Sequence, residues 1–315
     1  MNEKINNLKN EISKVVIGQA NMIDSLLIGL FTNGHILLEG VPGLAKTTTV
    51  KAVSNALDIN FKRVQFTPDL LPSDIIGAQI YNMKTNEFSI KKGPIFTNLL
   101  LADEINRAPS KVQSALLEVM QERQVTIAEN SFALDEPFLV LATQNPIEQE
   151  GAYTLPEAQL DRFMFKIVVG YNTKEEEYTI ASKVSSNSFE PINPILTIDE
   201  LKNIKKEINN IHIDKQLEDY ILDIIFATRQ PEDYDLKDIK HLIEFGASPR
   251  ATIDMFKAVK AKAYLRGNDH VSPLDIASIT KDVLRHRIIL SYEAQADGIT
   301  TDNIIQKILK KIPIP

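Results

Sequence analysis

Residues 35–50, HILLEGVPGLAKTTTV, constrain the fold of this 315-residue chain more than any other stretch. The apolar run at 36–38 predicts a strand, the glycines and proline at 40–43 predict a tight turn, and the segment from Lys46 predicts a helix. This order aims several backbone N–H groups and the positive end of a helix at one point, which suits a phosphate group. The stretch therefore predicts a phosphate-binding loop within an α/β domain.

The usual pattern of such a loop, G-x-x-x-x-G-K-[ST], has a glycine where this chain has Ala45. We expect this alanine to be harmless, because the position lies in the first turn of the helix, where right-handed dihedral angles suffice. Lys46 would reach the β- and γ-phosphates of a nucleotide, and Thr47 would place its hydroxyl on Mg²⁺. Gly40 and Gly43 would let the backbone approach the ligand. A Gly-Pro turn before an ordinary helix is the alternative that this stretch leaves open.

Short apolar runs alternate with helical patterns from residue 35 to about 170, as in an α/β domain with a mostly parallel sheet. The predicted strands are His35–Glu39, Phe61–Phe66, Ile95–Ala102, Phe138–Thr143 and Phe165–Val169. The runs ILLE and NLLLA are apolar at consecutive positions, so we expect helices on both faces and the two strands side by side mid-sheet. The spacing predicts helices over Lys46–Leu57 and Lys111–Gln124.

Residues 185–201 are rich in Ser, Asn and Pro and mark the predicted domain boundary. They end with Thr197 three residues before Glu200, a capping-box pattern that opens a helix. Beyond this point the pattern is helical only, for example at Leu217–Thr228 and Ala251–Leu265. We therefore expect an α/β core over residues 1–190 and a smaller helical domain over residues 197–315.

Composition excludes several classes of protein. Zero cysteines exclude disulfides, thiolate zinc sites and cysteine catalysis, and fit a reducing cytoplasm. No apolar run approaches the roughly 20 residues that span a bilayer, and the N-terminus lacks the apolar core of a signal peptide. The net charge of −7 argues against broad non-specific binding to nucleic acid, although a local basic groove stays open. We expect a cytoplasmic protein.

Polar side chains end two further predicted strands: Asp103 and Glu104 after NLLLA, and Asn145 after FLVLATQ. The Asp103 carboxylate would bind Mg²⁺, and Glu104 would orient and deprotonate a water that attacks the γ-phosphate. The Asn145 amide would contact that phosphate or hold the water. Parallel strands deliver their carboxyl ends to one crevice, so we expect these residues to meet the phosphate loop. Alone, an acidic pair and an Asn-Pro turn are ordinary loop features, but together with the loop they favour a nucleotide site.

Two arginines complete the candidate site, Arg162 in LPEAQLDRF and Arg250 in GASPRA. A guanidinium spreads positive charge over the oxygens of a phosphoryl transition state, and one subunit can provide it to a neighbour. An ordinary surface ion pair is the alternative for each.

These residues resemble the MoxR family of AAA+ ATPases over about residues 15–295. The motifs that carry the resemblance are VIGQ (16–19), LLEGVPGLAKT (37–47), DLLPSDIIG (69–77), LLLADEINRAPSKVQSALLEVMQE (99–122), ATQNPIEQEGAYTLPEAQLDRFMF (142–165), GASPRA (246–251) and VLRHRIILSYEA (283–294). The resemblance implies a P-loop core with a parallel five-stranded sheet in the order 5-1-4-3-2 and an all-helical lid. It implies a ring, usually a hexamer, with ATP and Mg²⁺ between subunits. It also implies that GVPGLAKT is a common form of the family's phosphate loop.

By this resemblance, Thr47 and Asp103 hold the metal, and Glu104 completes the Walker B pair. Asn145 matches sensor 1, Arg162 the arginine finger and Arg250 sensor 2, and which arginine acts on a neighbouring subunit varies in the wider clade. The implied nucleotide-binding residues are Gly18 and Gln19 at the adenine, then Gly40, Val41, Pro42, Gly43, Leu44, Ala45, Lys46, Thr47 and Thr48, with Arg250 from the lid. A turn that only connects helices is the alternative for Gly18 and Gln19.

Residues 66–97 form a long link between two predicted strands, and YNMKTNEFSI within it predicts a hairpin with its turn at Lys84–Asn86. By resemblance this is the helix-2 insert, which faces the pore of the ring or a partner. Similar proteins act as chaperone-like remodellers, often with proteins that carry a von Willebrand factor A domain.

Two alternatives stay open. A nucleic-acid motor would need phosphate contacts from the hairpin, whose Lys84, Lys91 and Lys92 are offset by Glu87. A slowly hydrolysing assembly or switch protein, including a chelatase-type metal-insertion motor subunit, is the other.

Overall fold

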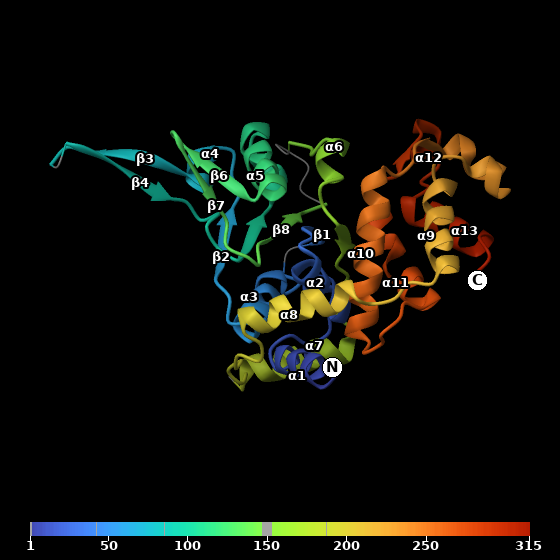
Figure 1. The fold of residues 1–315 in the computed structure, drawn as a ribbon, viewed down its shortest axis with the longest axis horizontal. Coiled ribbons are helices and arrows are strands. Elements are labelled where there is room, and N and C mark those ends of the chain that lie inside the picture. The colour runs from blue at the N-terminus through green and yellow to red at the C-terminus, as the bar shows by residue number, and fades with distance from the viewer. Residues whose placement is uncertain (1, 42, 85, 147–152, 187) are drawn as a thin grey trace.

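The computed structural model describes residues 2–41, 43–84, 86–146, 153–186 and 188–315 (Figure 1). Its central sheet has five parallel strands, β1 (Ile36–Glu39), β2 (Phe61–Gln65), β5 (Leu99–Asp103), β8 (Leu139–Gln144) and β9 (Phe165–Val168). Their spatial order is β2-β5-β8-β1-β9, which confirms the order 5-1-4-3-2 when these strands are counted along the chain.

Two expectations about the strands are wrong. First, β1 and β5 are not neighbours, because β8 pairs with both and separates them. Apolar residues on both faces show that a strand is internal, but not which strand it pairs with. Second, β5 begins at Leu99 rather than at Ile95. The hydroxyl of Thr97 donates to the carbonyl of Asn60 and the amide of Asn98 donates to the carbonyl of Pro137, which holds these two residues in a turn before the strand.

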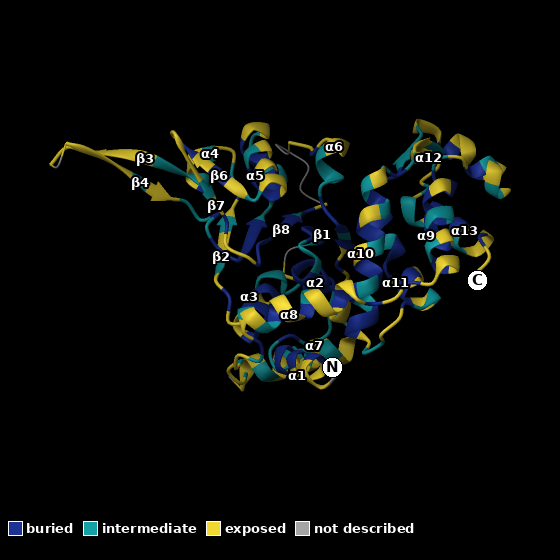
Figure 2. Ribbon diagram, viewed as in Figure 1, coloured by how far each residue is buried: buried dark blue, intermediate teal, exposed yellow. Residues whose placement is uncertain are grey.

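The side chains of each central strand alternate between two apolar clusters, as the pleat requires. In β5, Leu100 and Ala102 pack with helix α5 (Ser110–Glu122), the helix predicted over Lys111–Gln124, whose Val112, Leu116, Val119 and Met120 are buried there. Leu99 and Leu101 point to the opposite face. That face is covered by α1 (Asn2–Ser13), α2 (Ala20–Thr32) and α3 (Lys46–Ala56). The strands are therefore buried on both sides, which Figure 2 shows as dark blue arrows within the core.

Two hairpins leave this sheet. After the short helix α4 (Pro72–Ile76), β3 (Gly77–Asn82) and β4 (Glu87–Lys92) pair antiparallel, as the sequence predicted. They extend well away from the other elements (Figure 1). Thr85, in the predicted turn, lies outside the described residues. The second hairpin, β6 (Gln124–Ile127) with β7 (Asn130–Ala133), was not predicted.

The C-terminal half is mainly helical. Its helices are α6 (Glu157–Leu160), α7 (Lys174–Ser185), α8 (Ile198–Asn209), α9 (Lys215–Ala227), α10 (Pro249–Leu265), α11 (Pro273–Leu284), α12 (Tyr292–Ala296) and α13 (Thr301–Lys311). The predicted capping box opens α8, where Thr197 accepts from the backbone N–H of Glu200. The expectation of helices alone is wrong in one detail, because β10 (Ile243–Phe245) pairs antiparallel with β11 (Ile289–Leu290). Within the described ranges, no helix is long and apolar enough to cross a bilayer.

One apolar cluster joins the sheet face that is covered by α1, α2 and α3 to the helical domain. It contains Leu99 of β5 and Leu26 of α2, together with Ile225 of α9, Met255 of α10 and Ile279 of α11. Helix α10 packs against both α2 and α11, and α11 packs against β9. Helix α2 and the edge strand β9 are therefore both places where core and helical domain meet.

Candidate functional site

The loop between β1 and α3 has the shape that the sequence predicted, for partly different reasons. Gly43 adopts φ 88°, a left-handed conformation that favours glycine. A Cβ on Gly40 would lie 3.0 Å from the carbonyl oxygen of Val169, so Gly40 permits contact with the end of β9. Pro42 lies outside the described residues. Gly43 thus allows the turn, and Gly40 allows the loop to pack against the end of β9.

Ala45 corrects our reasoning about the missing glycine. The residue has φ 54° and ψ 20° and is the N-cap of α3, so it does not have the right-handed dihedral angles that we expected. An L-residue in this left-handed region is strained by roughly 1–2 kcal/mol relative to glycine. The alanine is therefore tolerated at a conformational cost, and the position is one that glycine would suit.

Lys46 lies across the loop that it follows. Its Nζ donates to the carbonyl of Gly40 at 2.6 Å. Burial lowers the pKa of Lys46, and the nearby carboxylates of Asp103 and Glu104 oppose this shift. The ammonium group is thus held at the base of the loop, facing the acidic residues at the end of β5.

Asp103, at the end of β5, is held by two neighbouring strands. The hydroxyl of Thr143 on β8 donates to its Oδ1 at 2.6 Å, and Arg63 on β2 donates to its Oδ2 at 2.6 and 3.0 Å. The Asp103 side chain is 17% exposed, whereas that of Arg63 is 49% exposed. The carboxylate is fixed from the sheet side, while the arginine that covers it can move into solvent.

Glu104 follows directly with φ 57°, a second strained backbone position. Its backbone N–H donates to Thr143 Oγ1 at 2.9 Å. Its Oε2 accepts from Gln65 Nε2 at 2.7 Å and pairs with Arg107 Nε at 3.1 Å. The strained turn directs the two consecutive carboxylates to separate sets of partners.

A cavity of about 380 Å³ lies where these groups converge. Asn145, which follows β8 and is buried, also lines it. We call this cavity the phosphate pocket, lined by Gly40, Gly43, Leu44, Ala45, Lys46, Thr47, Thr48, Arg63, Gln65, Asp103, Glu104, Thr143 and Asn145. It brings together the residues of the two strand ends and, of the predicted loop residues that the structure describes, all except Val41.

Gly18 and Gln19 do not line the phosphate pocket. The Gln19 amide donates to the carbonyl of Gly170 at 3.2 Å and to Asn172 Oδ1 at 2.8 Å, in the loop after β9. That loop follows Val169, the residue that contacts Gly40. The two residues thus adjoin the phosphate loop through the end of β9.

Arg162 and Arg250 lie together in a different cavity, of about 270 Å³. We call it the arginine pocket, lined by Thr32, Asn33, Gly34, His35, Met120, Gln121, Arg123, Arg162, Met164, Arg250, Ile253, Asp254 and Lys257. Among the described residues, the two pockets share no lining residue. The structure therefore brings the two arginines together, but not to the phosphate pocket of their own chain.

The partners of the two arginines differ. Arg162 Nη1 donates to the carbonyl of Leu117 at 2.9 Å, and within the described ranges Arg162 makes no ion pair. Arg250 pairs with Asp161 at 3.3 Å and stays 41% exposed. The alternative of an ordinary ion pair thus applies to Arg250 and not to Arg162.

Sequence reasoning missed Arg63, Gln65 and Thr143 as members of the phosphate pocket. The β2–β5 register places Gln65 beside Asp103 and Arg63 beside Leu101, so both polar side chains lie near the acidic strand end. The alternate polar positions in FKRVQ were the available signal. They indicate an edge strand, but only the register shows what lies beside them.

Two family profiles match the chain. The ATPase family associated with various cellular activities (AAA) matches residues 35–165, and an AAA lid domain matches residues 237–308. Chaperone MoxR1 of Mycobacterium tuberculosis is 47% identical, over 97% of this chain and 81% of that protein. The uncharacterized protein YeaC of Bacillus subtilis is 42% identical, over 96% of this chain and 92% of its own length. A crystal structure from Cytophaga hutchinsonii, of a protein assigned as an ATPase, is 52% identical and superposes with a TM-score of 0.94, covering 100% of this chain and 96% of that one.

Proposed function

The chain belongs to the MoxR family of AAA+ ATPases, and from this premise we propose that it hydrolyses ATP to ADP and phosphate in the phosphate pocket. We further propose that it does so as a ring, usually a hexamer in this family, and uses the energy to remodel a partner protein. The observation that carries the proposal is the convergence of a phosphate loop, two acidic residues and a buried asparagine from three parallel strand ends on one cavity.

The residues of the pocket suit a magnesium nucleotide. The hydroxyl of Thr47 and the carboxylate of Asp103 are hard oxygen ligands, and Lys46 faces the same cavity. The described part of the chain contains no cluster of three or more His, Cys, Asp or Glu side chains that could hold a metal alone. The metal would therefore share its coordination with phosphate oxygens, as Mg²⁺ commonly does. When bound, Mg²⁺ would neutralise charge on the transferred phosphoryl group.

We assign the general base to Glu104. Both contacts of its carboxylate with Gln65 and Arg107 fall on Oε2, so we assign acceptance of the water proton to Oε1. This role needs correct placement more than an unusual pKa. We assign Asn145 to orienting the water or the γ-phosphate, since it lines the same cavity from the end of β8.

We propose that Arg162 and Arg250 act on the nucleotide of a neighbouring subunit. Their separation from their own phosphate pocket supports this role. Each pocket would then be half of a composite site, closed when two copies meet head to tail in a ring. The cationic side would stabilise charge on the transferred phosphoryl group.

We propose that the β3–β4 hairpin contacts the partner or client. Its apolar side chains are unusually exposed, with Met83 at 86% and Phe88 at 65%. An exposed apolar patch commonly marks a protein contact. The similarity to a protein named as a chaperone supports a protein client, and a von Willebrand factor A domain protein is the partner that we propose first.

We also propose a domain division into a core over residues 1–190 and a lid over 197–315, and a cytoplasmic location. The AAA lid match at 237–308 supports the lid. Helix α8 packs against α2 as well as against α10, so it bridges the proposed domains. Zero cysteines suit a reducing compartment.

The test compares ATP turnover of the purified protein with that of its Lys46→Ala and Glu104→Gln variants. We expect both variants to lose turnover about a hundredfold or more, and Glu104→Gln to keep nucleotide binding. Full turnover in both variants would contradict the assignment. Glu104→Gln loaded with ATP should also retain the partner in a pull-down, and strong stimulation of turnover by DNA would instead favour a nucleic-acid motor.

A further inference from the structure

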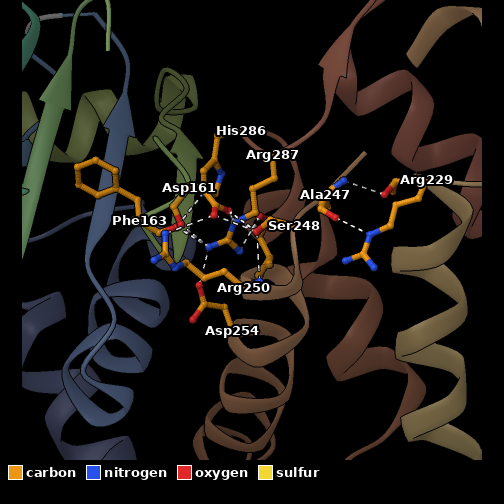
Figure 3. Close-up of polar contacts among 11 residues, drawn as sticks. Asp161, Phe163, Arg229, Ala247, Ser248, Arg250, Asp254, His286 and Arg287 are labelled. Carbon is orange, nitrogen blue, oxygen red and sulfur yellow. Dashed lines mark hydrogen bonds and ion pairs between the residues drawn. The ribbon is translucent and has the colours of Figure 1, made fainter. Parts of the chain in front are cut away.

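We propose that Asp161 is a positioning residue that holds both arginines of the arginine pocket in the geometry needed by the neighbouring subunit. The inference rests on the proposed function and adds a residue that lines neither pocket. Asp161 lies between α6 and β9, directly before Arg162. Its carboxylate links the core to the helical lid (Figure 3).

The carboxylate of Asp161 binds three lid residues. Ser248 Oγ lies 2.9 Å from each carboxylate oxygen, and Arg250 Nη1 lies 3.3 Å from Oδ2. Arg287 Nε donates to Oδ1 at 2.9 Å. Because Ser248 is the N-cap of α10 and Arg250 is near that helix's start, Asp161 fixes the end of α10 that carries Arg250.

Arg287 fixes the other arginine from the opposite side. Its side chain is fully buried, and its Nη2 donates to the backbone carbonyls of Asp161 at 3.2 Å and Phe163 at 2.8 Å. These two carbonyls flank Arg162. Figure 3 shows Arg287 between Asp161 and Asp254, the second carboxylate that it binds. The backbone on both sides of Arg162 is therefore held by a lid residue whose own charge is compensated.

The result is one polar network that holds the Arg250 guanidinium and the backbone on both sides of Arg162. Arg162 and Arg250 line the same pocket with Arg123 and Lys257, and Asp254, the carboxylate that lines it, is bound to Arg287. Arg250 and Arg123 each have one carboxylate partner, Asp161 and Glu136, so the lining stays mainly cationic, which suits the phosphates of a nucleotide. A shift of about 1 Å in this set would cost roughly a hundredfold in rate, since catalysis depends on placement.

A matched control exists in the same interface. Asp302 binds Arg285 at 2.7 and 3.0 Å, and Arg285 also donates to the carbonyl of Lys166 on β9 at 2.6 Å. This is a second aspartate–arginine pair that ties the lid to the core, but its contacts are with Lys166 and Asp282 and not with Arg162 or Arg250. Asp161→Asn and Asp302→Asn should both lower the melting temperature.

The two variants should differ in catalysis. We expect Asp161→Asn to lower kcat about tenfold or more, while the affinity for a fluorescent ATP analogue changes less than about threefold. Asp302→Asn should keep both values. Ser248→Ala, which removes one contact of Asp161, should also lower kcat more than nucleotide affinity, but by a smaller factor. This variant replaces Asp161→Asn in the test if Asp161→Asn does not fold. Equal loss of kcat in Asp161→Asn and Asp302→Asn, or full kcat in both Asp161→Asn and Ser248→Ala, would overturn the inference.

Mixed rings give the decisive readout. Asp161→Asn and Glu104→Gln subunits carrying different tags are co-expressed and purified through both tags. If Asp161 acts on the neighbouring subunit, an interface is intact when an Asp161→Asn subunit supplies Glu104 and a Glu104→Gln subunit supplies Asp161. About one interface in four of a mixed ring has this arrangement, so turnover should rise above that of a ring made of either variant alone. No rise would overturn the inference. If wild-type protein lacks turnover, the proposed function fails; if Arg162→Ala loses turnover and Asp161→Asn keeps it, only the positioning role fails.

Discussion

The phosphate pocket and the arginine pocket are built from different kinds of structure. The phosphate pocket collects residues from adjacent strand ends, and its charges balance, with Lys46 and Arg63 facing Asp103 and Glu104. The arginine pocket collects residues from three helices, α2, α5 and α10, and from loops of core and lid, and its charges are mostly positive. In the function that we propose, the first pocket would hold the metal and the phosphates, and the second would complete that site in a neighbouring copy. If so, a single copy should be a poor ATPase.

The largest expected effect separates binding from turnover. Arg162→Ala should lower turnover about a thousandfold, since a guanidinium on the transferred phosphoryl group is worth that much or more. It should leave the nucleotide affinity of its own subunit nearly unchanged, whereas Lys46→Ala should abolish binding. Nucleotide titration and steady-state kinetics of both variants make the comparison. Equal loss of binding in the two variants would place Arg162 in its own phosphate pocket.

Acid should destabilise the protein through His35, which lines the arginine pocket. Burial lowers the pKa of His35 to about 4, with Arg123 adding to the shift against the hydrogen bond to Met120. Because the pKa of His35 is lower in the folded than in the unfolded protein, protonation of His35 favours unfolding. The free energy of unfolding is therefore highest above pH 6.5 and falls as the pH decreases toward 4. We expect a loss of about 1 kcal/mol by pH 5.5 and about 3 kcal/mol by pH 4.

Urea denaturation at pH 7.5, 6.5 and 5.5 measures this slope, with His35→Gln as the control that should flatten it. The neutral ring accepts from the Val140 N–H at 2.9 Å and contacts the Met120 carbonyl at 3.0 Å. Burial also lowers the pKa of His286, which contacts the carbonyl of Phe163 at 2.8 Å, so part of the slope should persist. If the free energy of unfolding depends on pH equally in His35→Gln and in the wild-type protein, His35 is not the cause of the dependence.

A smaller effect is expected in the phosphate loop. Ala45→Gly should raise the free energy of unfolding by about 1 kcal/mol or less, because relief of the left-handed strain is partly offset by the entropy of glycine. Gly43→Ala, at φ 88°, should lower it by a similar amount. Thermal or urea unfolding of the two variants tests the pair. A destabilised Ala45→Gly protein would mean that the alanine methyl contributes packing that outweighs its strain.

The smallest effect concerns Arg63. Arg63→Gln removes the cation on Asp103 and should lower the Mg²⁺ concentration for half-maximal nucleotide binding by a few fold, as expected for a half-exposed ion pair. Arg107→Gln, which removes the cation on Glu104, should leave it unchanged. Magnesium titrations followed by a fluorescent nucleotide distinguish them. A higher requirement in Arg63→Gln would show that Arg63 assists the bound nucleotide.

The sequence predicted the phosphate pocket far better than the arginine pocket. Lys46, Asp103 and Asn145 stand at turns after apolar runs, and a parallel sheet collects such turns by geometry alone. Gln65 depends on the register of β2 against β5, which no local pattern encodes. The backbone of Ala45 was misjudged because residue type only biases a dihedral angle, and the loop around it decides the outcome.

The contacts between Asp161 and the lid could not be predicted from the sequence. Ser248 and Arg287 lie 87 and 126 positions from Asp161 in the sequence, and each of the three is an ordinary polar residue of its own segment. Arg162 and Arg250 were identified as a pair of candidates, but not as members of one pocket. Only the packing of α10 and α11 on the core brings these segments together.

One apolar cluster runs from the sheet face covered by α1, α2 and α3 into the lid. Leu26 and Leu99 in the core and Met255 and Ile279 in the lid are all buried members of it. Opening the lid as a rigid flap would bring much of this apolar surface into water, at roughly 25 cal/mol for each Å². In the ring that we propose, movement during the ATPase cycle would therefore be sliding of packed helices within each subunit, with larger displacements at the contacts between subunits.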